Sequence, residues 1–254
     1  MEQTLLAIAV GNTRTRFGLF EGKELSSTGS ERSDQPELIA AEVGKLLANF
    51  AGAPIIISTV NVPASEKIRR AVEAHGDVYV IGTDIAIPLT HALDDASTLG
   101  QDRALCALAA YSRAGQACVV IDAGTAVTVD FIDGQGVFQG GVIAPGLNMM
   151  LKALHEHTAA LPLLEFAKPD EARGVFGRDT AHAMMLGAQA GVRGLVREAI
   201  ERYAIAYEAY PQIIATGGDA AVLFDGDDLV EVVVPDLQLV GILEAARAEM
   251  DADA

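Results

Sequence analysis

The chain has 254 residues, of which 50% are hydrophobic and 21% charged, so its composition is that of a folded protein rather than a disordered one. It carries 35 acidic against 18 basic residues, and a net charge of −17 disfavours nucleic acid and anionic membranes as partners. The two cysteines, Cys106 and Cys118, match no zinc or redox spacing, and no apolar run is long enough to cross a bilayer. We therefore expect a cytoplasmic protein with reduced thiols and no membrane segment.

The first half of the chain begins with the apolar run Leu5 to Val10, which is typical of a strand buried on both faces. Gly11-Asn12-Thr13 interrupts this run, and two further strands are predicted over 14–20 and 23–28. The elements expected next are a helix over 36–49 capped by Asp34, a buried strand over 55–60, a helix over 65–75, a strand over 78–81 and a helix over 100–113. This half is therefore of the α/β class.

The opening pattern returns after Gly115, where we place the boundary between an N-terminal domain, 1–114, and a C-terminal domain, 115–254. Placing Val10-Gly11-Asn12-Thr13 over Ala123-Gly124-Thr125 superposes strand, turn and strand, which indicates an internal repeat; a chance match of short strands is the alternative. The elements expected in this half are strands over 117–123, 127–132 and from 136, helices over 148–157 and 180–207 (the second capped by Thr180), a strand over 213–215, a helix over 220–224, a strand over 229–234 and a helix over 237–250.

Three glycine turns follow buried strands and are suited to binding a nucleotide. Glycine lacks a Cβ, so backbone N–H groups in Gly11-Asn12-Thr13 and Gly124-Thr125 can approach phosphate oxygens, and the neighbouring polar side chains add donors. Two such turns in equivalent places of a repeat can grip one polyphosphate from opposite sides. Gly217-Gly218 could support a base or ribose, or could be a tight strand-to-helix turn and nothing more.

Two carboxylates have the positions that phosphoryl transfer requires. Asp102 lies in the first turn of a predicted helix, where it could accept the proton of an attacking hydroxyl. The alternative is that Asp102 and Arg103 form a helix-capping pair. Asp122 ends an apolar strand beside Gly124, and a carboxylate in that setting favours a bound cation.

The chain resembles type III pantothenate kinases, which belong to the superfamily of acetate kinase, sugar kinases, Hsp70 and actin. The resemblance covers most of the chain and rests on an ordered set of motifs rather than on any single one. These motifs are Val10-Gly11-Asn12-Thr13-Arg14-Thr15, Gly100-Gln101-Asp102-Arg103, Ile121-Asp122-Ala123-Gly124-Thr125-Ala126, Gly140-Gly141-Val142-Ile143-Ala144-Pro145-Gly146, Leu161-Pro162, Gly177-Arg178-Asp179-Thr180 and Ala215-Thr216-Gly217-Gly218.

The resemblance implies two duplicated ribonuclease H-like domains that face a central nucleotide cleft, as in actin-like ATPases. It also implies ATP-dependent phosphorylation of pantothenate to 4′-phosphopantothenate, the first step towards coenzyme A, with Mg²⁺ and a monovalent cation, K⁺ or NH₄⁺. Such enzymes are homodimers, with the long helices of the second half at the interface. The resemblance implies that ATP is bound by Gly11, Asn12, Thr13, Arg14, Thr125, Gly217 and Gly218. It implies that pantothenate is bound by Gly100, Gln101, Asp102 and Arg103, together with Thr180 from a neighbouring subunit. It also implies that Asp102 is the general base and that Asp122 binds the monovalent cation.

The sequence departs from the family pattern at three positions. The first motif of the family reads Asp-Xaa-Gly-Asn-Thr, and its Asp, which helps to hold the divalent metal, is replaced by Ala9. A Tyr in the pantothenate-binding segment is replaced by Leu93, and a Pro by Ala96. Two alternatives to an active pantothenate kinase follow: a catalytically impaired nucleotide-binding homologue with a regulatory role, and a kinase of the same fold that acts on another hydroxylated acid.

Overall fold

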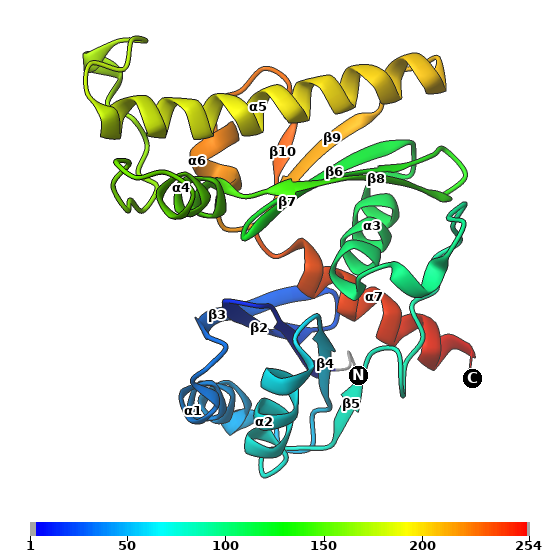
Figure 1. Cartoon of the computed structure of the whole chain (residues 1–254). Helices are drawn as coiled ribbons and strands as arrows, with labels where there is room; N and C mark the ends of the chain where they lie inside the picture. Colours follow the sequence, from blue (N-terminus) through cyan, green and yellow to red (C-terminus); the bar gives the residue numbers. More distant parts are fainter. Residues whose placement is uncertain (1–3, 253–254) are drawn as a thin grey trace. The chain divides into compact units, whose positions relative to one another are not determined.

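The computed structural model describes residues 4–252, and within this range the chain divides into two compact units. Unit 1 runs up to Arg113 and resumes at Asp236, whereas unit 2 is Ala114–Pro235. Each unit contains one five-stranded sheet with helices packed on it (Figure 1). Among the helices of residues 4–252, none has both the length and the apolar character that crossing a bilayer requires.

Unit 1 contains a mixed sheet in the order β3-β2-β1-β4-β5. The first three strands pair antiparallel, and β4 and β5 add parallel to β1. The elements of this unit are β1 (Thr4–Val10), β2 (Arg14–Glu21), β3 (Glu24–Arg32), α1 (Pro36–Leu46), β4 (Ile55–Thr59), α2 (Val62–Val72), β5 (Val78–Val80), α3 (Gln101–Ala114) and α7 (Leu237–Ala252).

Both faces of the unit 1 sheet are covered, which explains the unbroken apolar run of β1. Leu6, Ile8 and Val10 face one way, into a core shared with α1 and α2. Leu5 and Ala7 face the other way, into a core that includes residues of α3 and α7. The strand is therefore held from both sides, and the polar turn that follows it is fixed at the edge of a rigid sheet.

Unit 2 repeats the same strand order, β10-β9-β6-β7-β8, with β6 in the place of β1. Its β6 pairs antiparallel with β7 and parallel with β9, as β1 pairs with β2 and β4. This correspondence of order and direction confirms the internal repeat. The elements are β6 (Cys118–Ala123), β7 (Ala126–Ile132), β8 (Phe138–Pro145), α4 (Leu147–Glu156), α5 (Thr180–Tyr207), β9 (Gln212–Thr216), α6 (Ala220–Phe224) and β10 (Val232–Val233).

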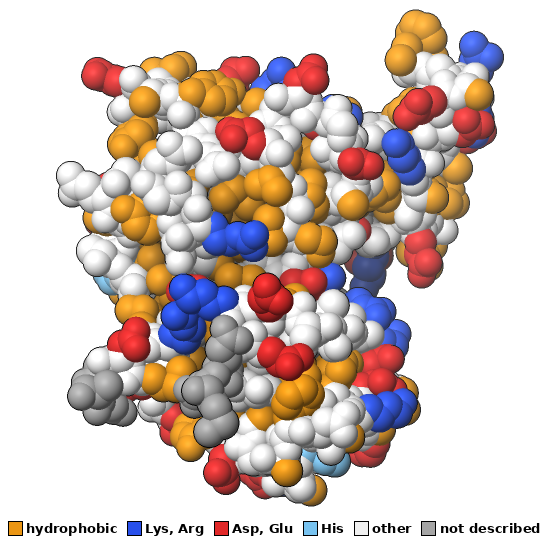
Figure 2. Space-filling model, turned by 180° about the vertical axis from the view of Figure 1, so that it is seen from behind, with side chains coloured by type: hydrophobic (Ala, Val, Ile, Leu, Met, Phe, Trp, Pro, Cys, Tyr) orange, Lys and Arg blue, Asp and Glu red, His pale blue; other side chains and the backbone are white. Residues whose placement is uncertain are grey.

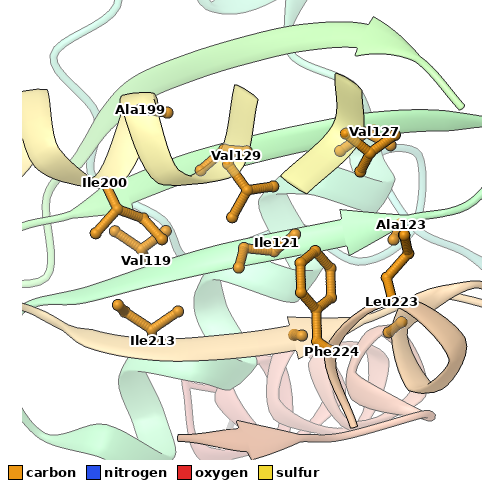
Figure 3. Packing of buried hydrophobic residues seen from close by; sticks show 14 of the residues in the cluster. Val119, Ile121, Ala123, Val127, Val129, Ala199, Ile200, Ile213, Leu223 and Phe224 are labelled. Carbon is orange, nitrogen blue, oxygen red and sulfur yellow. The ribbon is translucent and has the colours of Figure 1, made fainter. Parts of the chain in front are cut away.

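One face of the unit 2 sheet packs against α5 and α6. Figure 3 shows Val119 and Ile121 of β6 facing Ile200 of α5 and Phe224 of α6 across this core. Val119, Ile121 and Ile200 are fully buried. The 28-residue helix α5 therefore has one buried stripe, and its remaining surface carries polar and exposed apolar side chains.

Three expectations differ from the structure. The last helix, placed with the C-terminal domain by its position in the chain, packs instead in unit 1, where Leu239, Ile242 and Leu243 join the core beneath β1. Asp34 does not cap α1. The N-cap residue is Gln35, whose side chain makes no capping hydrogen bond, and Asp34 instead forms an ion pair with Arg32, with 2.7 Å between Arg32 Nη2 and Asp34 Oδ2. In each case a tertiary or neighbouring contact outweighs the local signal. The third difference, at the start of α5, is described with the site.

Candidate active site

The turn Gly11-Asn12-Thr13 joins β1 to β2 at the carboxyl end of β1. The Gly11 N–H donates to the Arg14 carbonyl oxygen at 3.1 Å, which closes a tight hairpin and leaves Asn12 and Thr13 exposed at its tip. A Cβ on Gly11 would lie 2.7 Å from that carbonyl oxygen, so a side chain at this position would force the hairpin apart. The sequence motif therefore marks a real constraint on the backbone.

Ser33, between β3 and α1, holds this turn in place. Its N–H donates to the Thr13 carbonyl oxygen at 3.1 Å, and its Oγ donates to the Gly11 carbonyl oxygen at 2.8 Å. Because that Oγ has a single proton, Thr15 Oγ1, 3.0 Å away, donates to it. Ser33 and Thr15 are both buried. Sequence reasoning missed Ser33, since nothing local links it to a turn so far away along the chain.

The side chain of Gln101 ties the start of α3 to the same edge of the unit 1 sheet. Its Oε1 accepts from the Thr59 N–H at 3.0 Å, and its Nε2 donates to the Ile81 carbonyl oxygen at 2.9 Å. Thr59 is the parallel partner of Val10, the residue before the glycine turn. The amide of Gln101 thus positions α3, a task that the sequence did not predict for it.

Asp102 lies in the first turn of α3, directly after this anchor, and is half-buried. One of its oxygens, Oδ1, accepts from the Arg103 N–H at 2.8 Å. The N-terminal end of a helix favours a carboxylate there. Unit 1 therefore brings the glycine turn and Asp102 to one edge of one sheet.

The other unit 1 candidates lie close by in the chain. Arg14 is exposed and donates from Nε to Ser30 Oγ and from Nη2 to the Ser30 carbonyl oxygen, each at 2.9 Å. Gly100 precedes α3, with Arg103 half-buried in its first turn, and Leu93 is half-buried in the loop before it.

In unit 2 the turn after β6 is held by backbone bonds from two neighbouring loops. The Gly146 N–H donates to the Thr125 carbonyl oxygen at 3.1 Å, and the Asp219 N–H donates to the Ala123 carbonyl oxygen at 2.9 Å. Gly217 has φ +95°, and a Cβ there would collide with the Ala123 carbonyl oxygen. The Thr125 turn and the Gly217-Gly218 turn therefore meet at one edge of the unit 2 sheet.

Two carboxylates accompany these unit 2 turns. Asp122 is half-buried and pairs with Thr128 of β7 and Thr216 of β9 in the sheet. Asp219 follows the glycine pair, and burial raises the pKa of its carboxyl group. Within residues 4–252, no group of three or more His, Cys, Asp or Glu side chains is placed to hold a metal ion by itself.

Thr180 is the first residue of α5 and is exposed, but it is not the cap. Asp179 caps the helix, because its Oδ1 accepts from the His182 N–H at 2.8 Å. The Arg173 guanidinium adds an ion pair at 2.6 Å, and these two contacts lower the pKa of the Asp179 carboxyl group. The expected cap is therefore wrong by one residue, because Asp179 and not Thr180 caps the helix.

Comparison with known proteins identifies the family. A family model described as type III pantothenate kinase matches residues 5–202. The chain belongs to the type III pantothenate kinase family. A family member from Frankia alni is 34% identical over 247 residues, covering 94% of this chain and 96% of its own. Another from Akkermansia muciniphila is 34% identical over 245 residues, covering 96% and 98%. These matches confirm the resemblance that the motifs indicated.

Solved structures support the fold of this pantothenate kinase family member. A conserved putative Baf family transcriptional activator from Campylobacter jejuni has a TM-score of 0.63 at 21% identity, covering 97% of this chain and 100% of that one. Component A of (R)-2-hydroxyglutaryl-CoA dehydratase from Acidaminococcus fermentans has a TM-score of 0.54 at 16% identity, covering 99% and 100%. At these identities the likeness concerns the fold alone, and it agrees with the duplicated α/β architecture expected from the sequence.

Proposed function

We propose that this chain uses ATP to phosphorylate pantothenate to 4′-phosphopantothenate, the first step of coenzyme A biosynthesis. The observation that carries the proposal is the anchor at Gln101, which fixes Asp102 at the sheet edge where the Gly11 turn lies. A kinase needs a carboxylate near the attacking hydroxyl and backbone donors near the transferred phosphoryl group. Unit 1 offers both on one rigid sheet.

In this mechanism Asp102 accepts the proton of the pantothenate hydroxyl. The hydroxyl oxygen then forms a bond to the γ-phosphorus of ATP while the bond from that phosphorus to the β,γ-bridging oxygen breaks, and ADP leaves. The proton on Asp102 passes to solvent after the product departs. Gly100 and Arg103, beside Asp102 in the chain, help to hold pantothenate.

The glycine turns bind the nucleotide in this proposal. Asn12, Thr13 and Arg14 contact phosphate oxygens from unit 1, where Gly11, which has no Cβ, lets the phosphates approach the backbone closely, and Thr125 contacts them from unit 2. The exposure of Asn12, Thr13 and Thr125 supports these roles, since their polar groups can reach a ligand. Gly217 and Gly218 support the adenosine part.

We expect ATP to bind with Mg²⁺ and Asp122 to bind a monovalent cation, K⁺ or NH₄⁺. Mg²⁺ is usually bound by one or two carboxylates together with substrate phosphates, so in this proposal it enters the site with ATP. The Mg²⁺ ion would offset negative charge on the phosphates. Asp122 is half-buried between two Thr residues, and a nearby cation would stabilise a carboxylate in this position.

We also propose that the protein acts as a homodimer, in which Thr180 of one subunit completes the pantothenate site of the other. Apolar side chains exposed next to α5 support this, because Val175 is 81% exposed and Phe176 74%. Figure 2 shows apolar side chains at the end of the segment that projects at the upper right, which Figure 1 traces to the residues before α5. A second copy of the chain is the partner that this surface would meet.

The cysteines support action in the cytoplasm. Cys106 and Cys118 are both buried and form no disulfide, and burial raises the pKa of the Cys118 thiol to about 12. Such thiols are unreactive core residues and suit a reducing compartment, where ATP is also available.

A direct assay tests the proposal. Purified protein is given ATP, Mg²⁺, K⁺ and pantothenate, and formation of 4′-phosphopantothenate is measured by mass spectrometry. We expect turnover by the natural sequence, a kcat lower by a factor of about 10²–10⁴ in Asp102→Asn, and full activity in the control Glu42→Gln on α1. Equal turnover in the natural chain and Asp102→Asn would refute the role of Asp102.

The same assay distinguishes the two alternatives. ATP binding without turnover on any acceptor would indicate an impaired nucleotide-binding homologue. This alternative is suggested by Ala9, whose buried methyl group stands where the family motif has an Asp. Turnover on another small hydroxylated acid, but not on pantothenate, would indicate a changed acceptor. This alternative is suggested by Leu93, which replaces a Tyr in the pantothenate-binding segment. Only turnover on pantothenate supports the proposed function.

A further inference from the structure

The helix that Asp219 begins does not account for the carboxylate of this residue. Asp219 is the N-cap residue of the short helix α6, yet its side chain makes no capping hydrogen bond. Its backbone angles, φ −97° and ψ −3°, fall in the helical region, whereas an N-cap Asp that bonds to its helix usually has extended angles. Within residues 4–252, no group donates a hydrogen bond to this carboxylate. Its function must therefore be sought outside the helix.

The backbone of Asp219 is fixed at the edge of the unit 2 sheet. Its N–H donates to the Ala123 carbonyl oxygen at 2.9 Å, at the carboxyl end of β6, and its carbonyl oxygen accepts from the Leu223 N–H at 3.1 Å. Figure 3 shows Leu223 beside this end of β6. Asp219 is half-buried, and burial raises the pKa of its carboxyl group. A carboxylate that is fixed and partly desolvated is stabilised by hydrogen-bond donors that a ligand brings.

Asp219 lies next to the two unit 2 turns that we assign to the nucleotide. It directly follows Gly217 and Gly218, and its N–H bonds to Ala123, the residue directly before the Gly124-Thr125 turn. Gly218 is exposed, and a Cβ there would meet no atom within 4 Å, so this turn borders open space. In a nucleotide the ribose lies between the phosphates and the base. A residue between the phosphate-binding turn and the glycine pair is therefore placed to meet the ribose.

The chemistry of a carboxylate selects the ribose among the parts of ATP. An ionised carboxylate only accepts hydrogen bonds, and it has two oxygens to do so. The ribose offers two neighbouring O–H donors, at its 2′ and 3′ positions, and acidic residues bind ribose hydroxyls in this way in dinucleotide-binding folds. The phosphates are anions, which a carboxylate repels. The ring nitrogens of adenine are acceptors too and leave only its amino group as a donor.

We propose that Asp219 binds the 2′- and 3′-hydroxyl groups of the ATP ribose, and that it thereby selects ribonucleotides over deoxyribonucleotides. This inference rests on the proposed function, because it needs ATP at the glycine turns. Asp219 contacts the substrate but takes no part in the transfer of the proton or the phosphoryl group, so it determines specificity. The competing arrangement places Asp219 together with Asp122 at one monovalent cation, since both residues lie beside Gly217.

Calorimetric titration with ATP, 2′-deoxyATP and 2′,3′-dideoxyATP, in Mg²⁺ and K⁺ but without pantothenate, tests the role of Asp219. We expect the natural chain to bind ATP about tenfold more tightly than 2′,3′-dideoxyATP, with 2′-deoxyATP in between, because hydrogen bonds to a charged acceptor are strong. Asp219→Ala should bind ATP and 2′,3′-dideoxyATP equally. Asp219→Asn, whose amide keeps one acceptor oxygen, should retain part of the preference. Equal affinity of the natural chain for ATP and 2′,3′-dideoxyATP would overturn the proposal.

A control variant and a ligand without a ribose show whether the effect belongs to this contact. The matched control is Asp225→Asn, which removes an exposed carboxylate at the other end of α6 and should leave the preference for ATP unchanged. Inorganic triphosphate should bind Asp219→Asn at least as tightly as the natural chain, since the variant removes a negative charge near the phosphates. A purely structural role of Asp219 would instead weaken ATP, 2′,3′-dideoxyATP and triphosphate by the same factor, and that result would overturn the proposal.

The titrations also test the competing arrangement when they are repeated with tetramethylammonium in place of K⁺. We expect Asp219→Ala to keep the gain in ATP affinity that K⁺ provides, because in this proposal the residue is no ligand of the cation. If Asp219→Ala loses that gain and still prefers ATP to 2′,3′-dideoxyATP, Asp219 belongs to a cation site and the proposal is wrong.

The outcomes distinguish this inference from the proposed function. Thermal melting of each variant shows whether it is folded before its binding is interpreted. Failure of the natural chain to bind ATP at all would defeat the kinase proposal, and this inference with it. ATP binding by the natural chain with no preference over 2′,3′-dideoxyATP would defeat this inference alone.

Discussion

The two glycine turns occupy equivalent places in two sheets of the same strand order, yet they are held by different means. In unit 1 a side chain takes part in fixing the turn, because the Ser33 Oγ donates to the Gly11 carbonyl oxygen while the Ser33 N–H donates to the Thr13 carbonyl oxygen. In unit 2 the turn is fixed by backbone groups, because the N–H groups of Gly146 and Asp219 bond to it directly. The duplication has therefore kept the arrangement of strands and has not kept the local chemistry.

This difference predicts which substitutions near the turn each unit tolerates. A turn that packs closely against another backbone segment requires glycine at the contact, because a Cβ would push the two segments apart. A turn held by a hydroxyl group depends on that hydroxyl group, and substitutions at its exposed tip cost little stability. The variants below test this contrast, from the largest expected effect to the smallest.

Gly217→Val should have the largest effect on unit 2. The new side chain would collide with the Ala123 carbonyl oxygen and would require φ near +95°, which a branched residue rarely adopts. We expect a loss of about 2 kcal/mol or more in the free energy of unfolding, measured by denaturant titration. The matched control is Gly218→Ala, since a Cβ there meets no atom within 4 Å. Equal stability of the two variants would contradict a turn held by backbone approach.

Gln101→Leu should weaken the attachment of α3 in unit 1. It removes the bonds to Thr59 and Ile81 and leaves both backbone groups without these partners, at a cost of about 2 kcal/mol. Because α3 carries Asp102, kcat should also fall about tenfold. Asp102→Asn serves as the comparison, since it should lower kcat with little loss of stability. A Gln101→Leu protein with unchanged stability and kcat would show that the amide does not position the helix.

Ser33→Ala should loosen the unit 1 turn by a smaller amount. It leaves the Gly11 carbonyl oxygen and the buried Thr15 hydroxyl group without this partner, and we expect a loss of about 1 kcal/mol in the free energy of unfolding. ATP affinity should fall a few-fold, as measured by calorimetry. The control Ser30→Ala removes a hydroxyl group bonded to the exposed Arg14 and should change stability by less than about 0.5 kcal/mol.

Asp219→Asn should produce the smallest effect, visible as a change in pH dependence. Burial raises the pKa of this carboxyl group, so the folded chain holds its proton more tightly than the unfolded chain does. Its contribution to stability is thus greatest at low pH and is lost as pH rises through the raised pKa. The variant should remove this loss, which we expect to be about 0.5 kcal/mol or less for a half-buried group, as measured by unfolding at several pH values. A steeper decline with pH in the variant would contradict this sign.

Much of the fold followed from the sequence because its signals are local. The apolar runs ending at Val10 and Ala123 predicted two buried strands, and the glycine motifs after them predicted the turns. The repeat of strand, turn and strand predicted the duplication, and the ordered motifs indicated the family. The C-terminal helix was assigned to the wrong unit, because nothing in an amphipathic pattern states which sheet will bury it.

The sequence by itself determined the order of elements, the glycine positions and the carboxylates at strand and helix ends, since each depends on residues close together in the chain. The tertiary structure alone decided that Ser33 holds the first turn, that Gln101 anchors α3 and that Asp236 faces Arg16 beside Ala9. These partners are far apart in sequence and meet only because strand pairing and helix packing bring them to one sheet edge. Hydrogen bonds and ion pairs of this kind leave no periodic trace in a single sequence, because their geometry exists only after the chain has folded.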